Sequence, residues 1–156
     1  TAVDDLKRPA EDAGAGFIGE LGFGSGVFYL YSCIDRDLLE MNLGGDARLA
    51  SEAIAAFVEG LATSSPTGKQ ASFARRARAS YLRVEKGDQQ PRSLAAAFFK
   101  PVKSDDHLRA SIEALESLAA AMNKAYGECF DGEPVTMNIQ DGKGSLGEAI
   151  KFASEA

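Results

Sequence analysis

The sequence predicts an α+β fold in which two amphipathic helices pack on one face of an antiparallel or mixed β-sheet. Three observations predict it: a β-branched and aromatic run at 27–34, and one-sided apolar stripes at 46–63 and 106–126. The chain has 156 residues, of which 45% are hydrophobic and 26% charged. It is therefore long enough for one domain with its own core.

The N-terminal half of the chain begins with a segment that has no regular period. Residues 1–26 contain six glycines and fit neither a helix nor a strand, so we expect a long irregular loop. The run at 27–34, Val-Phe-Tyr-Leu-Tyr-Ser-Cys-Ile, is typical of a strand with apolar residues on both faces. In 46–63 the apolar residues recur along one helical face, and Asp46 stands where an N-cap is expected.

The second half of the chain alternates between strand and helix patterns. A strand is expected at 79–85, where aromatic, basic and aliphatic residues alternate. A short apolar helix is expected at 93–99. The helix at 106–126 has apolar residues four and three positions apart, and Gly127 is expected to end it. A weak terminal helix is expected at 146–156.

Charge is distributed unevenly along the chain. The net charge is −6, but the stretch 68–103 contains nine basic and two acidic residues, so it carries +7 and leaves −13 for the rest. A basic stripe on an acidic body is expected of a protein that binds a polyanion in a groove. The alternative is a non-catalytic interaction or structural domain whose basic stripe binds acidic protein partners.

No motif in the sequence predicts an enzyme. Cys33 and Cys129 are too far apart for a metal-ligand pair, and the single histidine, His107, has no recognisable catalytic partners. The glycine-rich string at 22–26 lacks the spacing and the preceding strand of a dinucleotide-binding fingerprint. We therefore expect no catalytic residue, no metal and no cofactor. No apolar run is long enough to span a membrane, and no signal-type segment opens the chain, so we expect a cytoplasmic protein without a membrane partner.

Five strings occur in one order along the chain. They are Thr-Ala-Val-Asp-Asp-Leu at 1–6, Ser-Gly-Val-Phe-Tyr at 25–29, Asn-Leu-Gly-Gly at 42–45, Lys-Gln at 69–70, and Pro-Arg-Ser-Leu at 91–94 leading into Ala-Phe at 97–98 and Val102. In this order and spacing the chain resembles the C-terminal part of the CasC family, the backbone subunit of the type I-E CRISPR Cascade complex. The resemblance runs from Thr1 to about Tyr126.

The resemblance implies a hand-shaped protein whose palm has a ferredoxin-like, RNA-recognition-like fold. Residues 1–24 then correspond to a thumb-like glycine-rich loop, and residues 25–156 to the C-terminal part of the palm. In such a sheet the strands at 27–34 and 79–85 run parallel through a right-handed helical crossover, with a strand from outside this sequence between them. Because the chain opens on Thr1 within the thumb-like loop, we expect it to be part of a longer protein, with either a proteolytic cut or a chosen boundary of the expressed piece at that point.

The same resemblance implies partners and a set of RNA-binding residues. Copies of the family polymerise along the CRISPR RNA, together with other Cascade subunits, and the guide bases pair with target DNA in antiviral defence. Thr1 belongs to the family's contact set at the start of the thumb, and Lys69 and Gln70 correspond to a position that faces the RNA backbone. Three arginines depart from the family pattern and are assigned to RNA binding on charge alone: Arg75, Arg76 and Arg78.

Overall fold

The computed structural model describes residues 22, 24–68, 70–74 and 76–155. Its elements follow the order α1 (Arg36–Asn42), α2 (Ala47–Thr63), α3 (Gln70–Phe73), β1 (Tyr81–Val84), the 3-10 helix η1 (Ala95–Phe98), α4 (His107–Tyr126), β2 (Val135–Asn138) and α5 (Leu146–Ser154). The predicted α+β class is confirmed. Apart from Gly22 and Gly24, the thumb-like loop expected at 1–24 lies outside the described residues.

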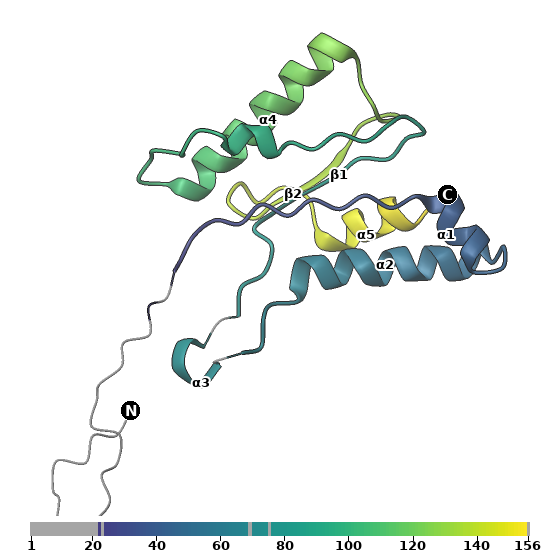
Figure 1. Ribbon diagram of the computed structural model, residues 1–156, viewed down its shortest axis with the longest axis horizontal. Helices are drawn as coiled ribbons and strands as arrows, with labels where there is room; N and C mark the ends of the chain where they lie inside the picture. The colour runs from purple at the N-terminus through teal and green to yellow at the C-terminus, as the bar shows by residue number, and fades with distance from the viewer. Residues whose placement is uncertain (1–21, 23, 69, 75, 156) are drawn as a thin grey trace, which may run out of the picture.

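An antiparallel pair of strands lies at the centre of the fold. β1 pairs with β2 in a register that places Tyr81 opposite Asn138 and Val84 opposite Val135. Figure 1 shows α4 on one side of this pair, with α5 and α2 on the other. The two long helices therefore lie on opposite faces of the strand pair. The prediction that both pack on one face is wrong. A ribbon of two short strands is marginal alone, and here both of its faces are covered.

The segment 27–34 is extended but is not a strand. None of its backbone groups is hydrogen-bonded to another backbone group within the described part of the chain, so the strand predicted at 27–34 is not formed there. Tyr29 anchors the segment, because its hydroxyl accepts from the Leu94 N–H at 3.1 Å and its ring lies 5.4 Å from that of Phe98. Phe28 and Leu30 are 81% and 72% exposed. The β-branched and aromatic residues favour an extended backbone, but a strand also needs a neighbouring strand to accept and donate its backbone hydrogen bonds.

Polar side chains cap the helices where the sequence places them. Asp46 accepts from the Leu49 N–H at the start of α2, and Asp106 accepts from the Arg109 N–H at the start of α4. Gly127, with φ of 82°, follows the last residue of α4 as predicted. The sequence patterns did not predict α1, which has only seven residues, the four-residue α3 or β2, and α5 ends two residues earlier than expected.

Two apolar clusters flank the β1–β2 pair. On one side α2 packs against α5 through its buried face, and Ala149 of α5 is fully buried. On the other side Leu94, Leu115 and Ala119 are buried, and Tyr81 of β1 packs against them. The buried residues of α2 recur every four positions: Ala50, Ile54, Val58 and Ala62.

Two cations bind the C-terminal end of α5. The Arg36 guanidinium donates to the carbonyl oxygens of Ser154 at 2.7 Å and Glu155 at 2.6 Å, and also to the Ser51 hydroxyl of α2 at 3.0 Å. Lys86, which follows β1, donates to the Phe152 and Glu155 carbonyl oxygens at 3.3 and 3.0 Å. These carbonyls have no partner within the helix and carry its negative dipole end, so positive charge is stabilising there.

Hydrogen exchange tests the unpaired state of 27–34. In the 156-residue chain we expect the amides of 29–34 to exchange at close to the rate of an unfolded peptide, because no backbone carbonyl of the described residues accepts from them. The amides of β1 should exchange roughly 100-fold more slowly or better. Equal protection of the two segments, measured by NMR or mass spectrometry, would show that 27–34 is paired.

Gly144 offers a stability test with a matched control. A Cβ built at Gly144 would lie 2.0 Å from the Thr136 carbonyl oxygen of β2, whereas Gly142 has a similar positive φ but open space around it. We expect Gly142→Ala to cost about 1–2 kcal/mol of left-handed strain. Gly144→Ala should cost at least about 2 kcal/mol more, because the clash is with backbone. Urea unfolding measures both, and equal losses would contradict the predicted clash.

Candidate nucleic-acid interface

The segment that joins α2 to β1 projects from the body of the protein. We call residues 64–80 the basic arm; Figure 1 shows it extending away from the helices, with α3 at its far end. Its base is closed where the Ala79 N–H donates to the Ala62 carbonyl at 2.8 Å. The arm thus leaves and re-enters the fold at one place, which holds its two limbs together.

The far end of the arm is shaped by local hydrogen bonds. The Gln70 side-chain amide donates to the Pro66 carbonyl at 2.9 Å, and the Ala74 N–H donates to the Gln70 carbonyl at 2.8 Å. Ala74 has a φ of 46°, the left-handed conformation that commonly ends a helix. The amide nitrogen of Gln70 therefore holds the turn, while its Oε1 is buried without a hydrogen-bond partner among the described residues.

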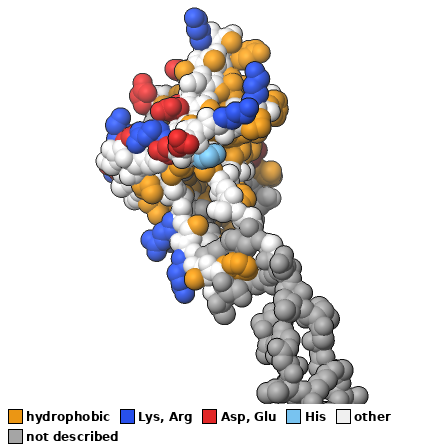
Figure 2. Space-filling view, turned by 90° about the vertical axis from the view of Figure 1, so that its left-hand side faces the viewer, with side chains coloured by type: hydrophobic (Ala, Val, Ile, Leu, Met, Phe, Trp, Pro, Cys, Tyr) orange, Lys and Arg blue, Asp and Glu red, His pale blue; other side chains and the backbone are white. Residues whose placement is uncertain are grey.

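Two of the predicted RNA-binding arginines are exposed on the limb of the arm that returns to β1. Arg76 and Arg78 make no hydrogen bond or ion pair with any residue that the structure describes. Figure 2 views the side from which the arm projects and shows Lys and Arg side chains both low and high on this face. Three predicted residues lie outside the described residues: Thr1, Lys69 and Arg75.

Three other cations of the basic stripe are used inside the protein. Arg83 and Arg92 have only 12% and 9% of their side chains exposed. Lys86 is bound to the end of α5 and lies 4.9 Å from the centre of the Phe152 ring. These residues contribute to the +7 of the stripe in the sequence, but they are engaged in contacts within the fold.

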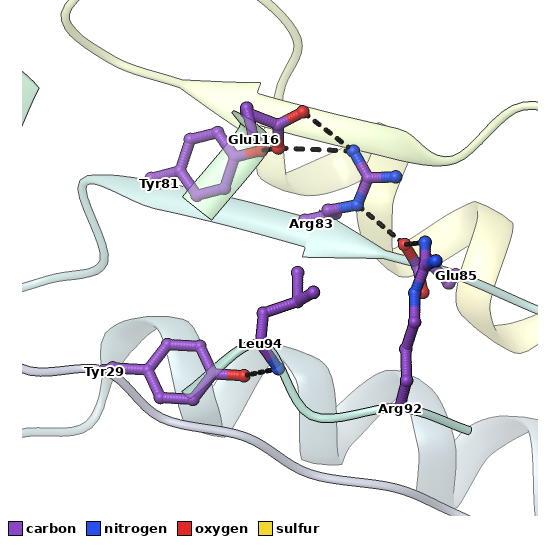
Figure 3. A network of polar contacts seen from close by, with 7 residues as sticks. All are labelled: Tyr29, Tyr81, Arg83, Glu85, Arg92, Leu94 and Glu116. Carbon is purple, nitrogen blue, oxygen red and sulfur yellow. Dashed lines mark hydrogen bonds and ion pairs between the residues drawn. The ribbon is translucent and has the colours of Figure 1, made fainter. Parts of the chain in front are cut away.

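Arg83 is the centre of a polar network between β1 and α4, drawn in Figure 3. Its Nε donates to Glu85 at 2.7 Å and its Nη1 to Glu116 at 3.0 Å. Burial lowers the pKa of Arg83, but the hydrogen bond to Glu85 and the charges of both carboxylates outweigh it, and the pKa is raised. The Tyr81 hydroxyl donates to Glu116 as well. Burial and this hydrogen bond raise the pKa of Tyr81, so the phenol stays protonated as a donor.

One aromatic ring lies close to the guanidinium groups of both arginines. The guanidinium carbons of Arg83 and Arg92 lie 5.8 and 5.4 Å from the centre of the Phe130 ring, and Phe130 is itself buried. Arg92 also donates to Glu85 at 3.3 Å, so one carboxylate joins both arginines. The network neutralises charge where solvent is excluded, which a buried cation requires.

The basic stripe is therefore divided in two by the fold. Its exposed cations among the described residues, none with an ion pair there, are Arg76, Arg78, Lys100 and Lys103. The sequence alone does not show which charges of the stripe are paired in the fold. The signal that distinguishes them is the alternation in β1, which places Arg83 on the same face as Tyr81.

The described residues contain no group of three or more His, Cys, Asp or Glu side chains that could hold a metal ion. His107 is exposed at the start of α4. Among the helices that the structure describes, none has the length and apolar character needed to cross a bilayer.

The fold and the exposed arm define a small α+β protein with a cationic projection. The family model Cas_CT1975, described as CT1975-like protein, matches residues 1–152. The chain therefore belongs to this family of CRISPR-associated (Cas) proteins. This confirms the predicted relation to Cas proteins in general. A comparison with curated proteins finds no match.

The fold is shared with a solved structure. The chain is similar to one described as "CRISPR RNA-guided surveillance complex", with 24% sequence identity and a TM-score of 0.63. The similarity covers 72% of this chain but 42% of the other, so this sequence spans less than half of that relative's length.

Loss of the Glu85 charge should destabilise the protein strongly. Glu85→Gln leaves Arg92 without a charged partner among the described residues, and Arg83 with Glu116 alone. We expect a loss of about 3–5 kcal/mol, as for other buried pairs that lose one member.

The matched control is Glu52→Gln, which removes the partner of Arg48 in an exposed pair on α2. Its expected cost is below about 1 kcal/mol. The free energy of unfolding in urea measures both variants. Equal effects would mean that the buried network contributes no more than a surface pair.

Proposed function

We propose that this chain is part of a CRISPR RNA-binding backbone subunit of the type I-E Cascade complex. The subunit would polymerise along the guide RNA beside other Cascade subunits and hold the RNA backbone while the bases pair with target DNA. Membership of a Cas family and a fold shared with a CRISPR RNA-guided surveillance complex support this proposal. The observation that carries it is the exposed, unpaired state of Arg76 and Arg78 on a projecting arm.

The arm suits binding that is independent of base sequence. Arginine guanidinium groups donate hydrogen bonds to phosphate oxygens and add charge, and neither contact depends on which base is present. A projecting limb also leaves the bases of a bound strand accessible from the other side. Lys69 and Arg75, which flank α3 in the sequence, would add two further cations to the same arm. We propose no catalytic role for any residue, and the reading of the target is left to base pairing.

The salt dependence of RNA binding tests this function. The variant Arg76→Ala/Arg78→Ala should bind single-stranded RNA more weakly whatever its sequence, because two phosphate contacts are lost. The salt slope, taken as the magnitude of the negative slope of log K against log salt, should decrease by about 1.4, at about 0.7 for each phosphate contact on a single strand. Fluorescence anisotropy with a labelled RNA, across a salt series, measures the slope.

The control is Lys124→Ala/Lys143→Ala, which removes the same charge from two exposed positions outside the arm. It should leave the slope close to that of the unmodified chain. If both variants lower the slope equally, net charge and not the arm determines binding. If neither does, the arginines are solvated surface, and a preference for acidic peptides over RNA would favour a protein-interaction domain.

A further inference from the structure

We propose a second contact for single-stranded nucleic acid at residues 99–103, between η1 and α4, with a base stacked on Phe99 and phosphates bound by Lys100 and Lys103. This contact deepens the proposed function and rests on it, but it uses residues that lie outside the basic arm. It is not among the RNA-binding positions expected from the sequence.

Phe99 is an aromatic side chain that the fold leaves uncovered. The two phenylalanines at the end of η1 face different environments: Phe98 packs against the buried cluster and lies 5.4 Å from the Tyr29 ring, whereas Phe99 is 83% exposed. Phe99 therefore contributes little to the core. An exposed ring of this kind is the stacking platform that proteins present to unpaired bases, and stacking tolerates every base because each has a π-face.

Two exposed cations follow Phe99 in the sequence. Lys100 and Lys103 are exposed, and neither makes a hydrogen bond or an ion pair with a residue that the structure describes. Pro101 lies between them and fixes its own backbone φ, which limits the freedom of the loop. Asp105 follows, yet residues 99–105 still carry +1. The acidic side chain of Asp106 accepts from the Arg109 N–H and faces the Arg109 guanidinium at 3.6 Å.

The pattern of ring and charge favours a nucleic-acid strand over a protein surface. A single strand presents planar bases beside anionic phosphates, and the loop presents one exposed ring followed by two cations. A protein partner would need a wider apolar patch, whereas the residues after Phe99 here are Lys, Pro, Val and Lys, and Val102 is half-buried.

The loop and the basic arm lie toward the same side of the molecule in Figure 1. The two differ in chemistry, because the described part of the arm has exposed cations but its one phenylalanine, Phe73, is half-buried. A strand held by charge at the arm would therefore gain an aromatic contact at the loop. The stacking contact on Phe99 adds affinity that does not depend on salt, since stacking releases no counterions.

Photo-crosslinking and binding on the 156-residue chain test the proposal, with 5-iodouridine RNA and the corresponding 5-iododeoxyuridine DNA as probes. We expect a crosslink on the peptide that contains Phe99, identified by mass spectrometry. Phe99→Ala should weaken binding roughly ten-fold with an unchanged salt slope, and Phe99→Tyr, which keeps the ring, should retain most of the affinity. Lys100→Ala/Lys103→Ala should lower the slope by about 1.4.

The matched control is Tyr126→Ala, because Tyr126 at the end of α4 is 86% exposed but is not part of the loop. It should leave binding unchanged. No crosslink at Phe99 and full affinity for Phe99→Ala, in a chain whose binding still depends on Arg76 and Arg78, would overturn this inference and leave the proposed function standing. Failure of the unmodified chain to bind either probe would overturn both. Comparison of the two probes distinguishes RNA from DNA as the strand that is held.

Discussion

The pairing of β1 with β2 is the constraint on which the other contacts of the fold depend. It joins two four-residue strands that are far apart in the sequence, and it has two faces that both need cover. On one face, Tyr81 and Arg83 bind Glu116 of α4 through a hydrogen bond and an ion pair. On the other, α5 contacts both strands and packs in turn against α2. Without the pair, the two apolar clusters would have no common element between them.

The same pair determines which cations are available for binding. Arg83 lies on a covered face, where its positive charge is costly unless it is paired, and Glu85 and Glu116 pair with it. Arg92 shares one of these carboxylates and the Phe130 ring. Charge that the sequence concentrates in one stripe is thereby divided into an internal part, which stabilises the fold, and an external part on the arm and the loop after η1. Only the external part can meet a polyanion.

The segment 27–34 shows what a strand pattern does and does not specify. Its β-branched and aromatic residues favour an extended backbone, and the structure has one. Tyr29 fixes one side of it to Leu94 and Phe98. Phe28 and Leu30 remain exposed, and the backbone of the segment has no ladder among the described residues. A strand is a property of a pair, and one sequence segment specifies only its own half.

The sequence by itself determined the features that depend on near neighbours. Asp46 and Asp106 cap α2 and α4, and an N-cap depends only on residues up to three positions away. Gly127 follows the end of α4 because glycine adopts the positive φ that is common there. The sequence also suggested Arg76 and Arg78 as RNA-binding residues, which stays a prediction; the structure shows that both are exposed. Tertiary structure alone decided that β2 is the partner of β1, that the long helices lie on opposite faces, and that Arg83 and Arg92 are buried while Phe99 is not. Each of these depends on contacts between residues distant in the sequence, and no local pattern encodes the partner.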